Sequence, residues 1–94
     1  MKDQILEWAN ERGLLNPDFA AKQMMKLTEE VGEIASAILK NKPEEQADGI
    51  GDAVVVLTIL ANQLGLDIDL CVKGAYQEIQ NRKGKLVGGT FIKE

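Results

Sequence analysis

The sequence of 94 residues contains no histidine, and this absence restricts the chemistry that any site can use. Without imidazole, a base or a metal ligand must be a carboxylate, a lysine or a water molecule bound to a metal ion. Cysteine is nearly absent as well, because Cys71 is the only one, so no disulfide can form within the chain. We expect Cys71 to be a reduced, buried thiol in a cytoplasmic protein.

Long hydrophobic runs and an excess of positive charge are also missing. The longest apolar run, residues 53–61, is interrupted by Thr58 and is far shorter than the roughly 20 residues of a membrane span. The formal net charge of −4 disfavours binding to a nucleic-acid backbone. We therefore expect a soluble protein without nucleic-acid or membrane partners. A chain this short buries a small core, which favours a homodimer or a homotetramer built as a dimer of dimers.

The apolar residues that are present recur at helical spacing and predict an all-α fold, a four-helix bundle with a short C-terminal extended arm or hairpin. The expected single domain covers residues 1–94, with helices at about 2–12, 18–40, 43–64 and 68–83 and a tail at 84–94. Either Asp67 or Asp69 can cap the fourth helix. The pair Gly88-Gly89 can turn a minimal hairpin in the tail, and an extended arm is the alternative.

Three glutamates lie close together on the second predicted helix. At roughly 100° per residue, the apolar stripe of this helix is centred between Leu27 and Val31. Glu30 and Glu33 project from the border of the stripe, where two carboxylates can chelate a hard cation. Glu29 points to the opposite, solvated side of the helix. The alternative interpretation is an ordinary charged helix face.

Asp52 lies on the third predicted helix, which is apolar on nearly every side between residues 50 and 60. We expect this helix to be central and buried, so the Asp52 carboxylate must either enter the core unpaired or meet a cation. Asp48 shares its face, four residues earlier. A set of oxygen ligands favours Mg²⁺ or Mn²⁺ over zinc. The alternative is a structural salt-bridge network in which Lys22 or Lys26 neutralises the acids.

Three glycines lie inside the helical patterns near these acids, namely Gly32, Gly49 and Gly51. A glycine in a helix costs up to about 1 kcal/mol relative to alanine, so these positions need a reason for the small side chain. The sequence leaves two reasons open, which are the close approach of a ligand and tight packing between helices.

The two acidic segments, Glu29 to Glu33 and Asp48 to Asp52, resemble the motifs of the MazG-like, all-α nucleoside triphosphate pyrophosphohydrolase superfamily. The family pattern is Glu-Glu-x-x-Glu, followed on the next long helix by Glu-x-x-Asp. The ending of the chain, residues 79–91, is also similar to a phage and bacterial branch of this family. One position departs from the pattern, because Gly49 stands where the family usually has glutamate.

The resemblance implies hydrolysis of a (deoxy)nucleoside triphosphate to the monophosphate and pyrophosphate, with Mg²⁺ or Mn²⁺ as the cofactor. Metal ligands would be Glu30, Glu33 and Asp52, and Asp48 would replace the carboxylate lost at Gly49. The catalytic residues would be Glu29 and Glu30, with Glu29 orienting the attacking water. The departure at Gly49 keeps a second hypothesis open, a non-catalytic helical oligomer or nucleotide-binding regulator.

The fourth helix and the segment that follows it offer donors for the substrate phosphates, namely Lys73, Asn81, Arg82 and Lys85. Their alternative role is to stabilise the negative end of the helix dipole. Trp8 is a candidate for stacking on the base of the nucleotide, although a tryptophan on an amphipathic helix also suits the core.

Overall fold

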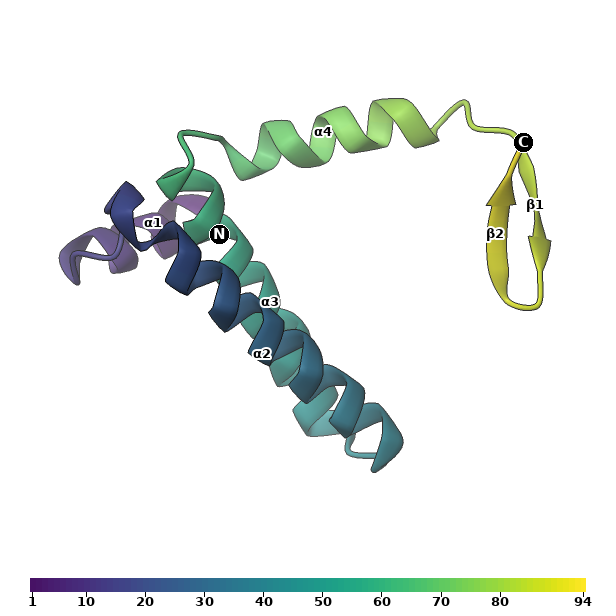
Figure 1. Cartoon of the computed structure of the whole chain (residues 1–94), viewed down its shortest axis with the longest axis horizontal. Helices are drawn as coiled ribbons and strands as arrows, with labels where there is room; N and C mark the ends of the chain where they lie inside the picture. Colours follow the sequence, from purple (N-terminus) through teal and green to yellow (C-terminus); the bar gives the residue numbers. More distant parts are fainter.

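The computed structural model describes all residues 1–94 and contains four α-helices followed by a two-stranded hairpin (Figure 1). The predicted all-α fold class is confirmed, and the alternative left open for the tail is decided in favour of the hairpin. The helices begin and end within four residues of the expected positions. No single helix has the length and apolar character needed to cross a membrane.

The N-terminal helix α1 (Lys2–Glu11) is followed by the short 3-10 helix η1 (Pro17–Phe19). Gly13 follows α1 and prevents the helix from continuing, because its φ is +71°, a value that glycine adopts without steric cost. The side chain of Asn16 then caps η1 by accepting a hydrogen bond of 2.8 Å from the backbone N–H of Asp18. These two turns place α1 against α3 and η1 beside α2 and α3.

The long helices α2 (Ala20–Leu39) and α3 (Pro43–Gln63) form an antiparallel pair that carries most of the packing (Figure 1). Pro43 opens α3 at a position where its missing N–H has no helical partner to lose. The small core lies between these helices and α1. Its buried apolar side chains are Ala9, Ala37, Val56, Ile59 and Ala61.

Gly49 lies where α3 packs closely against α2. A Cβ atom at this position would lie 2.7 Å from Cγ1 of Ile34, so helix packing explains this glycine. Gly32 and Gly51 differ, because a Cβ at either position would meet no atom within 4 Å. A larger side chain at position 49, including the glutamate of the family pattern, would require Ile34 to shift.

The C-terminal part of the chain extends away from the helices that precede it. Helix α4 (Ile68–Ile79) follows α3 across a bend of 104°, and β1 (Gly84–Val87) pairs with β2 (Thr90–Lys93) beyond its far end (Figure 1). Gly88 and Gly89 turn the hairpin with φ values of +56° and +82°. The residues from Asp69 to the end of the chain are all exposed, so the four helices do not close into a bundle within one chain.

The expectation that α3 is buried on all sides is wrong for a single chain. Ile50, Val54 and Leu57 form an exposed apolar stripe, with exposed fractions of 57%, 52% and 39%. Asp52 is exposed as well, and so is Cys71, which was expected to be buried. The stripe and Cys71 are exposed because α4 extends outward, whereas Asp52 lies roughly opposite the stripe, on the side of α3 that faces α2.

Candidate active site

Glu30 is the one acidic residue of the chain that is buried, with 4% of its surface exposed. One of its carboxylate oxygens, Oε1, lies 3.4 Å from Nζ of Lys26. The other oxygen, Oε2, is buried without any hydrogen-bond partner. A buried, unpartnered carboxylate oxygen is costly in free energy, and a cation or a donor from a ligand would remove that cost.

Glu30 lies at the charged end of a cavity of about 640 Å³. This volume falls within the range of roughly 300–1,000 Å³ typical of small-molecule sites. Helices α1, α2 and α3 and η1 all contribute side chains to it. The apolar wall consists of Leu14, Phe19, Val55, Val56 and Ile59, and the remaining lining residues are Trp8, Lys22, Gln23, Lys26, Glu30 and Asp52.

A second cavity of about 350 Å³ has no hydrophobic lining residue. Its carboxylates come from both long helices, with Glu33 on α2 and Glu45, Asp48 and Asp52 on α3. Asp52 lines both cavities, so the two cavities are neighbours that share this carboxylate. The structure thus brings the four predicted metal ligands to the same side of the α2 and α3 pair.

The charges of this region are unevenly compensated. The negative charge of Glu30 is the main cause that raises the pKa of Glu33 above its ordinary value, with smaller contributions from burial and from Asp52. Lys26 pairs with Glu30 and, at 4.0 Å, with Glu29. The alternative of a neutralising lysine is therefore realised in part, at one oxygen of Glu30, while Asp52 forms no ion pair with any lysine or arginine.

The carboxylates fit a hard divalent cation in their chemistry, although they are not gathered around one point. Every donor in the set is a carboxylate oxygen, the ligand type that Mg²⁺ prefers, and Oε2 of Glu30 has no other partner. No group of three or more acidic or cysteine side chains lies close enough together to hold an ion. The side chains of Glu33 and Asp52 are exposed, whereas that of Glu30 is buried.

The other predicted site residues lie at various distances from these cavities. Trp8 lines the larger cavity with 47% of its surface exposed, and the guanidinium of Arg12 lies 4.2 Å from the centre of its ring. Glu29 lines neither cavity. The predicted phosphate donors are Lys73, Asn81, Arg82 and Lys85. They line neither cavity, so the structure does not bring them to the candidate metal ligands of their own chain.

The larger cavity also contains residues that the sequence analysis did not assign to a substrate. Lys22 and Lys26 were considered only as neutralising partners of the acids, yet both line the cavity beside Glu30. Their spacing indicates that they lie on the same face of α2 as Glu30, because residues four apart share a helix face and Lys22, Lys26 and Glu30 follow one another at that interval. Phe19 had no comparable signal, since its position depends on how η1 packs.

Comparison with known proteins identifies relatives of most of this chain. Residues 20–87 match the family described as the MazG nucleotide pyrophosphohydrolase domain. A protein of Haemophilus phage HP1, described as an uncharacterized 18.2 kDa protein in the rep-hol intergenic region, is 46% identical over 63 residues. The aligned part covers 67% of this chain and 39% of the phage protein, so the chain spans well under two thirds of that relative. No solved structure shows significant similarity.

Proposed function

Since the chain belongs to the MazG nucleotide pyrophosphohydrolase family, we propose that it hydrolyses a nucleoside or deoxynucleoside triphosphate to the monophosphate and pyrophosphate. The cofactor in this proposal is Mg²⁺, with Mn²⁺ as a substitute. The observation that carries the proposal is the buried carboxylate of Glu30, which has one oxygen without a partner and belongs to a residue lining a cavity that is large enough for a nucleotide and is lined by two lysines.

The metal would be held by Glu30 and Asp52, with Glu33 and Asp48 as further ligands. A bound Mg²⁺ supplies a Lewis acid for phosphate oxygens and lowers the pKa of a coordinated water. The protein holds these carboxylates on the two long helices α2 and α3, which pack closely where Gly49 meets Ile34. Asp48 stands one residue before the glycine that replaces the glutamate of the family pattern, and it supplies a carboxylate to the same side.

The remaining groups of the larger cavity would bind the substrate itself. Lys22 and Lys26 are donors for phosphate oxygens, and Lys26 lies within reach of Glu30 already. The apolar wall and the ring of Trp8 suit a planar base. Glu29 is the candidate for orienting the attacking water, and its carboxylate lies 4.0 Å from Nζ of Lys26. In this proposal Glu29 and Glu30 are the catalytic residues.

We also propose that the protein acts as a homodimer or as a dimer of dimers. The exposed stripe of α3 and the exposed apolar side chains of α4 are surfaces that association would bury. The donors that follow α4, Arg82 in the connection and Lys85 in β1, could reach the candidate metal ligands only in another copy. Sedimentation velocity at micromolar concentration tests this point, and a monomer throughout would contradict it.

The decisive experiment is a substrate screen. Purified protein is incubated with each nucleoside and deoxynucleoside triphosphate and Mg²⁺, and pyrophosphate release is measured. The variant Glu30→Gln should abolish release, whereas Glu7→Gln, which changes an exposed acid of α1, should have no effect. Absence of release from every substrate would refute the enzyme and, if Trp8 fluorescence still reported nucleotide binding, would favour the non-catalytic nucleotide-binding regulator.

A further inference from the structure

The direction of α4 depends on few interactions. Its side chains from Asp69 onward are exposed, and within the chain it packs mainly against α3. The backbone at the bend between these two helices includes Gly65, whose φ of +75° allows the chain to leave α3. A helix with so little packing needs specific contacts at its start if it is to keep one direction.

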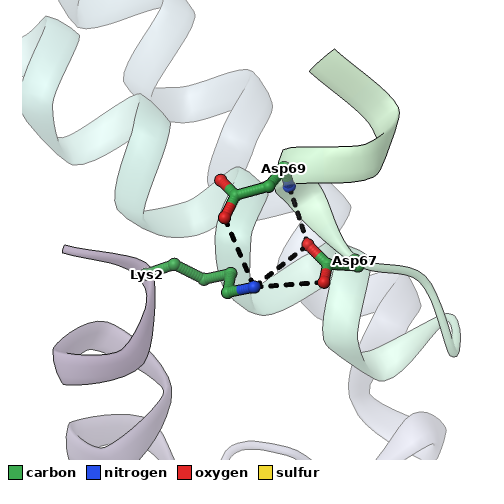
Figure 2. Close-up of polar contacts among 3 residues, drawn as sticks. All are labelled: Lys2, Asp67 and Asp69. Carbon is green, nitrogen blue, oxygen red and sulfur yellow. Dashed lines mark hydrogen bonds and ion pairs between the residues drawn. The ribbon is translucent and has the colours of Figure 1, made fainter. Parts of the chain in front are cut away.

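Lys2 of α1 supplies such contacts at the first turn of α4 (Figure 2). Its Nζ atom donates hydrogen bonds of 3.3 and 3.1 Å to the two carboxylate oxygens of Asp67 and lies 3.3 Å from Oδ2 of Asp69. Asp67 is also the N-cap of α4, because its Oδ1 accepts a hydrogen bond of 2.8 Å from the backbone N–H of Asp69. The same carboxylate therefore starts the helix and attaches it to α1.

The surroundings of Lys2 strengthen this attachment. The Lys2 side chain is 28% exposed, so it is shielded from solvent more than the usual surface lysine. It lines a cavity of about 100 Å³ together with the apolar residues Leu6, Leu66 and Ile68. A single exposed ion pair contributes little, but here one ammonium group contacts two carboxylates of a turn that has few other restraints.

We propose that Lys2 is a positioning residue that fixes the direction of α4 relative to α1. Helix α4 has 12 residues and is about 18 Å long, so a tilt of about 20° at its start moves its far end by about 6 Å. That end is followed directly by Asn81 and Arg82, two of the predicted phosphate donors. The consequence for substrate binding rests on the proposed function, whereas the direction of α4 does not.

The test measures the distance between Trp8 and the end of α4 by resonance energy transfer. In a Cys71→Ser background, the exposed Gln80→Cys provides a single labelling site for an acceptor, and Trp8 is the only tryptophan of the chain. A large excess of unlabelled protein removes transfer between copies. Lys2→Met and Asp67→Asn should each shift or broaden the distance distribution by about 6 Å, the displacement estimated for a 20° tilt.

Each variant has a role that separates positioning from stability. Asparagine caps a helix as well as aspartate does, so Asp67→Asn removes the ion pair and keeps the cap. Lys2→Arg keeps the positive charge and should therefore keep the distance of the parent protein. Asp3→Asn changes the neighbouring acid, which forms no ion pair, and should also leave the distance unchanged. Circular dichroism verifies that each variant is folded.

The outcomes for α4 and for the enzyme can be told apart. A distance distribution that is the same in the parent, Lys2→Met and Asp67→Asn would overturn the inference. If pyrophosphate release is found, Lys2→Met should raise KM several-fold and leave kcat nearly unchanged, and an unchanged KM would refute the link to substrate binding. A shifted distance in a chain without any hydrolysis would support the positioning role and refute the proposed function alone.

Discussion

The close approach of the two long helices at Gly49 leads to a quantitative prediction for Gly49→Ala. The new Cβ would lie 2.7 Å from Cγ1 of Ile34, well inside an ordinary contact, and Cγ1 sits on a branched carbon next to the backbone. Ile34 must therefore shift, and overpacking of this kind costs about 1–3 kcal/mol. Alanine recovers up to about 1 kcal/mol through its higher helix propensity. The net expectation is a loss of about 1 kcal/mol in the free energy of unfolding.

A matched control lies two residues away on the same helix. Gly51→Ala places its Cβ in open space, so only the propensity gain applies and the protein should become up to about 1 kcal/mol more stable. Urea denaturation of both variants at equal protein concentration measures the difference, which should be about 2 kcal/mol. In an Ile34→Ala background, the effect of Gly49→Ala should become smaller, because the clashing atom is gone. Equal stabilisation by both alanines would refute the packing argument.

The remaining predictions concern the candidate site and α4. Asp52→Asn should reduce Mg²⁺-dependent pyrophosphate release by at least about 100-fold, while the unfolding free energy without metal changes by less than about 0.5 kcal/mol because Asp52 is exposed. Lys2 lowers the pKa of Asp67 below its ordinary value of 3.8. The stability that this pair contributes should therefore be present above about pH 4 and be lost as the pH falls through the folded pKa, so urea midpoints of the parent and Lys2→Met should converge in acid. Trp8→Leu should raise KM for the triphosphate about tenfold, as expected for the loss of base stacking, and an unchanged KM would remove Trp8 from the site.

Local signals in the sequence explain why the helices could be predicted. Proline at the start of α3, glycine after α1 and the Asp67 cap act within one or two turns of the backbone, so they require no knowledge of the tertiary structure. Helical geometry placed Glu30 at the border of the apolar stripe centred between Leu27 and Val31. Because Val31 is 55% exposed in the structure, packing of this stripe does not explain the burial of Glu30. Its exposed fraction of 4% shows that α2 turns this border toward α3.

The exposure of Asp52 could not be predicted in the same way. Its apolar neighbours indicate that α3 avoids water, but they do not say whether the covering surface belongs to the same chain. In the structure, α4 turns away at Gly65 and leaves the stripe of Ile50, Val54 and Leu57 open, while Asp52, on the opposite side of α3, lines the open cavities beside α2. The direction of α4 is set by the contact between Lys2 and Asp67, two residues 65 positions apart, and no local pattern in the sequence reports such a contact.

The hairpin at the end of the chain has a consequence for the order in which the protein gains structure. Two strands of four residues, with Leu86, Val87, Phe91 and Ile92 all about half exposed or more, have no layer to pack on. Such a hairpin is marginal by itself, whereas α2 and α3 are neighbours in sequence and can pair early. The backbone amides of β1 and β2 should therefore exchange with solvent rapidly in an isolated chain. Slower amide exchange would indicate that the hairpin has packed against another surface.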